Sequence, residues 1–179
     1  GYHTGDYIAM GHRRLSILDT SFNGNQPMKD ESGRYTIVFN GEIYNYTELK
    51  QELISLGYGF KSNSDTEVLL TMYIHYKEKC LNKLNGFFAF VIHDKDTDSL
   101  FAARDRYGIK PLLYYYDEDK FVFGSEMKAV RSFNVKADLD YESLRMYFQL
   151  SYIPQPYTCY KGVKKLEPGH YAIVKKKEV

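Results

Sequence analysis

The sequence feature that most constrains the fold is a run of apolar residues at positions 87–93, which reads Phe-Phe-Ala-Phe-Val-Ile-His. Successive side chains of a β-strand point to opposite faces of the sheet. A strand with one face in solvent would therefore alternate apolar and polar residues, whereas this run is apolar on both faces. Such a strand must be covered on both sides. The run predicts either two stacked sheets or one sheet that is covered twice.

The apolar periodicity of the rest of the chain predicts an α+β fold without internal repeats. Strands are predicted over residues 7–17, 35–39, 87–93, 100–104, 112–116, 121–123 and 170–175. Helices are predicted over residues 46–56, from 64 through 76, over 125–132 and over 141–150. Asn45 and Ser64 are expected to cap the first two helices, and Gly57 to end the first. The close spacing of the strands between residues 87 and 123 predicts an antiparallel meander.

Composition sets a broad class and excludes several functions. With 179 residues, 44% of them hydrophobic, we expect a single domain with one substantial core. A formal net charge of +1 gives no electrostatic reason to expect nucleic acid or an anionic membrane as a partner, and nothing resembles a signal peptide or a long apolar span. Cys80 and Cys159 are too few for a disulfide framework, which favours a reducing cytoplasm and a role as small core residues. The five histidines show no metal-ligand spacing, and the sequence contains neither a phosphate-binding glycine pattern nor a Gly-x-Ser-x-Gly elbow.

Four polar segments at the ends of predicted elements are candidates for chemistry, and each also has a purely structural explanation. Asn40-Gly41 is either a hairpin turn or a source of hydrogen-bond donors for a site. Asp65 is either a favourable charge at a helix start or a binding carboxylate. Residues 11–14 can be a solvated strand edge, and residues 104–106 an ion-pair cluster of small energetic weight. Taken singly, none of these segments identifies a function.

Taken together and in order, the polar segments resemble one known family. The order is GHRRLSILD, QPM, NGEIYNY, SDTEV, LNGFFAF, RDRYGIKPL and SEMKA. It resembles the class II glutamine amidotransferase (glutaminase) domain of glutamine-hydrolysing asparagine synthetases over residues 1–169. The segments Arg13-Arg14-Leu15 and Glu42-Ile43-Tyr44 favour this type over the sister family that makes glucosamine phosphate. The resemblance implies an N-terminal nucleophile hydrolase fold, an αββα sandwich of two antiparallel sheets flanked by helices.

The resemblance also implies a set of site residues. Asn40, through its side-chain amide, and Gly41, through its backbone N–H, would form an oxyanion hole. Arg14 would bind the α-carboxylate of glutamine, while Glu42 and Asp65 would meet its α-ammonium group. No metal or cofactor is implied for this domain. The family's nucleophile is a cysteine at the mature N-terminus, whose α-amino group can act as the general base.

That cysteine does not occur at the matching place in this sequence. We therefore expect the chain by itself to bind glutamine poorly and not to hydrolyse it. We expect an N-terminally truncated glutaminase domain over residues 1–170, with residues 171–179 forming the last strand and the start of a linker.

By the same resemblance, the linker would lead to a synthetase domain that uses ATP and Mg²⁺ to amidate aspartate with the ammonia. The expected partners are L-glutamine, that synthetase domain and, because an exposed sheet edge favours association, a second copy in a homodimer. Two alternatives stay open. One is an amidotransferase serving another acceptor, such as a surface sugar or an antibiotic precursor, and the other is a non-catalytic amino-acid-binding module.

Overall fold

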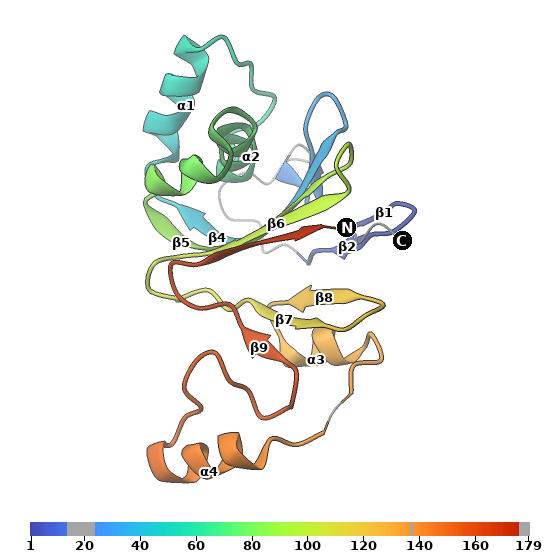
Figure 1. Ribbon diagram of the computed structural model, residues 1–179. Helices are drawn as coiled ribbons and strands as arrows, with labels where there is room; N and C mark the ends of the chain where they lie inside the picture. The colour runs from blue at the N-terminus through green and yellow to red at the C-terminus, as the bar shows by residue number, and fades with distance from the viewer. Residues whose placement is uncertain (14–23, 137, 176–179) are drawn as a thin grey trace.

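The computed structural model of the chain describes residues 1–13, 24–136 and 138–175. These residues form successive layers of helices, a five-stranded sheet, a three-stranded sheet and further helices (Figure 1). All strand pairs are antiparallel. The predicted αββα sandwich is confirmed.

The larger sheet has the strand order β10-β6-β5-β4-β3. Its strands are β3 (Met28–Lys29), β4 (Tyr35–Ile43), β5 (Gly86–Asp94), β6 (Ser99–Arg104) and β10 (Tyr171–Lys175). The apolar run forms most of β5, which is the central strand, and every residue from 88 to 94 is buried. The prediction of a strand covered on both faces is confirmed.

The smaller sheet has the order β8-β7-β9, and a separate hairpin lies beside the two sheets (Figure 1). The sheet consists of β7 (Leu113–Tyr116), β8 (Phe121–Gly124) and β9 (Lys164–Lys165). The hairpin consists of β1 (Tyr2–Thr4) and β2 (Ala9–Gly11). Met10 of β2 packs between the two sheets with Val38, Val91 and Leu112.

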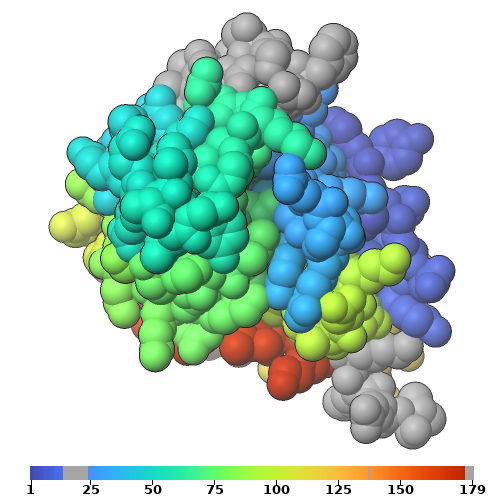
Figure 2. Space-filling model, turned by 90° about the horizontal axis from the view of Figure 1, so that it is seen from above, coloured from blue at the N-terminus to red at the C-terminus, as the bar shows by residue number. Residues whose placement is uncertain are grey.

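Helices cover the outer faces of the sandwich. α1 (Tyr46–Ser55) and α2 (Asp65–Tyr76), followed by the 3₁₀ helix η2 (Lys77–Asn82), lie over the larger sheet (Figure 1). Viewed from above, α1 lies at the surface over this sheet, with the β3–β4 turn to one side of it, while α2 is mostly buried (Figure 2). α3 (Met127–Arg131) packs on the smaller sheet, and α4 (Tyr141–Leu150) lies beyond it (Figure 1).

The largest core fills the space between α1, α2 and the larger sheet. It includes the fully buried Ile37, Leu53, Leu69, Met72 and Phe90. Each side chain of this kind contributes about 1.5–3 kcal/mol when it is removed from water. This burial fixes α2 against β4 and so sets the place of the residues at the start of α2.

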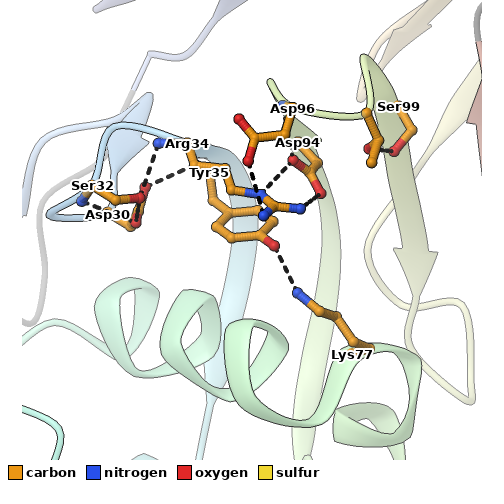
Figure 3. A network of polar contacts seen from close by, with 9 residues as sticks. Asp30, Ser32, Arg34, Tyr35, Lys77, Asp94, Asp96 and Ser99 are labelled. Carbon is orange, nitrogen blue, oxygen red and sulfur yellow. Dashed lines mark hydrogen bonds and ion pairs between the residues drawn. The ribbon is translucent and has the colours of Figure 1, made fainter.

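A polar network anchors the first half of β4, at the end away from Asn40 (Figure 3). Arg34 donates from Nε and Nη2 to the two carboxylate oxygens of Asp94, each at 2.7 Å, and its Nη1 lies 2.9 Å from Asp96 Oδ2. Lys77 Nζ donates to the Tyr35 hydroxyl at 2.7 Å. Burial acts to raise the pKa of Asp94, but its bonds with Arg34 hold that pKa below the ordinary value. The start of β4 is thereby tied to β5 and η2.

Three local predictions are wrong. The strand expected over residues 7–17 begins only at Ala9, because the Gly5 N–H closes a turn onto Ile8 O at 2.8 Å; residues 9–11 form the short β2, which pairs with an unpredicted β1, and residues 14–17 lie outside the described residues. The meander is divided between the two sheets, with the β5–β6 pair in one and the β7–β8 pair in the other. Asn45 does not cap α1 through its side chain, which bonds instead to the backbone of Lys83 and Asn85.

Other local predictions are confirmed. Ser64 caps α2, because its hydroxyl accepts from the Thr66 N–H at 3.1 Å. Gly57, with a φ of 92°, follows the end of α1 and donates to Ile54 O.

Candidate active site

Asn40 and Gly41 lie inside β4 rather than in a turn. They are paired with Ala89 and Phe88 of β5. The hairpin-turn explanation is therefore wrong. Gly41 has a φ of 153°, and a Cβ atom there would lie 2.1 Å from the carbonyl oxygen of Phe87. Only glycine lets the two strands approach this closely.

The backbone N–H of Gly41 points outward from an edge of β4. In an antiparallel strand, the N–H groups of alternate residues point to the same edge. On this edge, the Phe39 N–H donates to Gln26 Oε1 at 2.6 Å, and the Ile43 N–H donates to Asp65 Oδ2 at 3.1 Å. Gly41 lies between them, and its N–H has no hydrogen-bond partner among the described residues. The strand thus presents one available donor beyond the reach of β3, whose two residues pair with Thr36 and Ile37.

This donor faces a pocket of about 500 Å³. Asn40, Gly41, Glu42 and Asp65, all predicted from the sequence, line it together. Arg14, the fifth predicted residue, lies outside the described residues. The other lining residues are Gly11, His12, Arg13, Gln26, Phe39, Thr66, Lys110, Ser125, Glu126 and Ala129. The volume is in the range of about 300–1,000 Å³ that is usual for small-molecule sites.

The Asn40 carboxamide lies beside the Gly41 donor and is oriented by a neighbouring side chain. Successive residues of β4 point to opposite faces, so Asn40 shares the face of Val38 and is directed toward the smaller sheet. Its Nδ2 donates to Ser125 Oγ at 3.3 Å. An amide nitrogen carries two hydrogens, and this bond uses one of them. The second amide hydrogen of Asn40 is therefore available beside the Gly41 N–H.

Charged groups of both signs line the pocket. Arg13 and Lys110 supply positive charge, while Glu42, Asp65 and Glu126 supply negative charge. Asp65 is only 6% exposed, and its bond to the Ile43 N–H holds the start of α2 against the end of β4. A pocket with this mixture complements a zwitterion, such as a free amino acid, better than an ion of one sign.

A tightly bonded turn holds Lys110 in the pocket wall. The fully buried Asp105 accepts from the backbone N–H groups of Tyr107, Ile109, Lys110 and Phe88, at 3.0–3.3 Å. Burial acts to raise the pKa of Asp105, but these four donors hold it below the ordinary value.

Arg104 fastens the same turn from the other side. Its guanidinium donates to the carbonyl oxygens of Gly108, Lys110 and Leu166 and to Gln155 Oε1, at 2.6–2.7 Å. Burial lowers the pKa of Arg104. The structural explanation of residues 104–106 as an ion-pair cluster is therefore wrong. The side chains of Arg104, Asp105 and Arg106 bond chiefly to backbone groups and hold them in place.

Neither cysteine reaches the pocket. Cys80 is fully buried in the core beneath α2, as predicted, and burial raises the pKa of its thiol to about 12. Cys159 is half-buried, and neither residue is among those that line the pocket. In the described part of the chain, no group of three or more His, Cys, Asp or Glu side chains could hold a metal ion. No helix within the described ranges is long and apolar enough to cross a membrane.

Sequence reasoning missed several pocket residues. Gln26, Lys110 and Ser125 lie in the QPM, GIKPL and SEMKA segments, but no role was predicted for them. The only sequence signal was their place in the shared motif order. The contacts of Gln26 with α2 and of Ser125 with β4 span 40 and 85 positions along the chain.

Comparisons with known proteins agree with this geometry. The family model described as "Glutamine amidotransferase domain" matches residues 1–179. Glutamine-hydrolysing asparagine synthetase 1 of Bacillus subtilis is 47% identical over 169 residues, which are 94% of this chain and 27% of that protein. The amidase chry2 of Gibberella zeae is 40% identical over 172 residues, 96% of this chain and 25% of that protein. The chain thus spans about a quarter of the length of these relatives.

A solved structure supports the same conclusion. The glutamine phosphoribosylpyrophosphate amidotransferase of B. subtilis, complexed with ADP and GMP, superposes with a TM-score of 0.63 at 26% identity. The match covers 93% of this chain and 32% of that one. The fold is that of the N-terminal nucleophile hydrolases, as expected. With its motifs, its sandwich of sheets and its pocket in agreement, the chain belongs to the glutamine amidotransferase domain family.

Proposed function

We propose that the pocket binds L-glutamine and that the protein hydrolyses the side-chain amide to glutamate and ammonia. The observation that carries this proposal is the outward Gly41 N–H beside the Asn40 carboxamide. Attack on an amide carbon produces a tetrahedral intermediate with a negatively charged oxygen, and two fixed donors would stabilise that charge. The acidic side chains Glu42 and Asp65 would bind the α-ammonium group of glutamine. Arg14 would bind its α-carboxylate.

The nucleophile would come from a cysteine on a segment outside residues 1–179. A mainly apolar cleft of about 330 Å³ supports this, because it adjoins the pocket and shares Asn40 and Ser125 with it. The cleft is bounded by β2 on one side and by β8 on the other, and β8 is an edge strand among the described residues. An extended segment between these two strands would extend both ladders and place its end beside Asn40.

The ammonia would be used by a second domain of the same polypeptide. The relative from B. subtilis is named for glutamine-dependent asparagine synthesis, which favours aspartate as acceptor and ATP with Mg²⁺ as reagents of the absent domain. Because the similarly related chry2 is named an amidase, another acceptor is the alternative. The two free cysteines favour a cytoplasmic location. Homodimer formation stays a prediction, which sedimentation would check.

Expression of the longest protein that the gene encodes tests the proposal. We expect it to release glutamate and ammonia from L-glutamine, and to form asparagine when aspartate and Mg-ATP are added. Replacing its N-terminal cysteine with alanine should abolish release, and residues 1–179 alone should release none. A long protein that binds glutamine without releasing ammonia would instead be an amino-acid-binding module.

A further inference from the structure

One buried carboxamide connects the two walls of the pocket. Gln26 is only 6% exposed. Its Oε1 accepts from the Phe39 N–H at 2.6 Å, and its Nε2 donates to Thr66 Oγ1 at 3.3 Å. Phe39 precedes Asn40 on β4, and Thr66 follows Asp65 on α2. A single side chain therefore touches the neighbours of both an oxyanion donor and a binding carboxylate.

Strand register explains why a side chain serves here. Met28 of β3 pairs with Ile37 of β4. Continuing this antiparallel register places Gln26 opposite Phe39. The intervening Pro27 has no N–H to contribute to a ladder, and β3 begins only at Met28. The Gln26 side chain thus takes the place of a strand partner for the Phe39 N–H.

This contact helps to fix the Gly41 donor. The N–H groups of Phe39, Gly41 and Ile43 follow one another along the same edge, about 7 Å apart. Gln26 holds the first and Asp65 holds the third. Gly41 has no side chain to pack, so the position of its N–H depends on the anchored N–H groups of Phe39 and Ile43 on either side. Movement of either point would change the direction of its N–H.

We propose that Gln26 is a positioning residue that sets the Gly41 N–H, and with it the oxyanion hole, at a fixed distance from the start of α2. This inference rests on the proposed glutamine hydrolysis. Glutamine held at its α-ammonium group by Asp65 reaches the oxyanion donors only if β4 and α2 keep this spacing. Both polar atoms of the Gln26 side chain are bonded to Phe39 and Thr66, so its proposed effect is on alignment. Loss of the link should lower turnover more than affinity.

The Gln26→Met variant of the longest gene product tests this, because methionine keeps the length of the side chain without its hydrogen bonds. We expect kcat for glutamine hydrolysis to fall by between tenfold and about 10²-fold, the size of effect that small misalignments produce. KM should change by less than about threefold, because the charged binding groups remain. Ammonia-dependent amidation of the acceptor should be unchanged. The exposed Gln51→Met on α1 is the matched control and should behave as wild type.

The outcomes separate the two proposals. A wild-type protein that releases no ammonia refutes the proposed function itself. If wild type is active and Gln26→Met has normal kcat, or loses kcat and ammonia-dependent activity equally, the positioning role is refuted. Should Gln26→Met fail to fold, the isosteric Thr66→Val, which removes only the second contact, takes its place. For Thr66→Val, a fall in kcat smaller than that expected for Gln26→Met, at constant KM, supports the role, and an unchanged kcat refutes it.

Discussion

Replacing Asp105 with asparagine should destabilise the chain strongly, because four backbone N–H groups converge on this one carboxylate. Asparagine has the same shape but offers only one acceptor oxygen. Each carboxylate oxygen of Asp105 accepts from two of these N–H groups. Whichever oxygen the amide NH₂ replaces, the two N–H groups bonded to it lose their acceptor and face a donor. Each unsatisfied buried group costs about 1–3 kcal/mol, and the exposed side of the turn can relax, so we expect a loss of about 2–4 kcal/mol.

Thermal denaturation of residues 1–179, followed by circular dichroism, measures this loss. For a chain of this size, about 1 kcal/mol corresponds to about 2–4 °C, so Tm should fall by about 4–16 °C. The matched control is Asp119→Asn, at an exposed position whose side chain has no hydrogen bond or ion pair among the described contacts. A Tm of Asp105→Asn within 1 °C of wild type would refute the proposed role of this carboxylate.

The pH dependence of stability gives a second readout of the same variant. The folded-state pKa of Asp105 is lowered, whereas an unfolded aspartate titrates near about 3.9. The contribution of the carboxylate is therefore complete above that value and is lost as the pH falls through the folded-state pKa. The stability difference between wild type and Asp105→Asn should be constant from neutral pH down to about pH 5 and shrink below about pH 4. A difference that grows on acidification would contradict the assignment.

Two further predictions concern the chain itself. Gly41→Ala should lower the free energy of unfolding by about 3 kcal/mol or more, because the added Cβ would lie 2.1 Å from the Phe87 carbonyl oxygen. The control Gly59→Ala should be nearly neutral, because its Cβ meets no atom within 4 Å. Equal urea midpoints for the two variants would be inconsistent with the close β4–β5 contact. At pH 8, a thiol reagent should modify Cys159 quickly and Cys80 very slowly, because Cys80 is fully buried and its thiol has a pKa of about 12; equal rates at the two thiols would show that the core beneath α2 opens.

The parts of the fold that could be predicted depend on local rules. The central strand β5 follows from its apolar run, and the start of α2 follows from the capping preference of Ser64. Asn40-Gly41 shows where such rules fail. As a dipeptide it favours a turn, but pairing with Ala89 and Phe88 keeps it in a strand. That pairing depends on the arrangement of distant segments.

The candidate site was predictable only as far as its motifs. Asn40, Gly41, Glu42 and Asp65 were identified by resemblance, and the structure brings these four together. Their supports were not predictable, because Gln26 acts across 40 positions and binds backbone as well as side chain. A buried glutamine carries no local pattern that distinguishes this role from an ordinary core position.

The kcat of glutamine hydrolysis by the Asn40→Ala variant of the longest gene product tests the central claim most directly. Loss of one oxyanion donor should lower kcat by about 10²–10³-fold while KM and ammonia-dependent synthesis stay near wild type. The variant should still fold, because among the described residues the Asn40 side chain makes a single bond, of 3.3 Å to Ser125. Normal turnover in a folded Asn40→Ala protein would remove Asn40 from the mechanism and contradict the account.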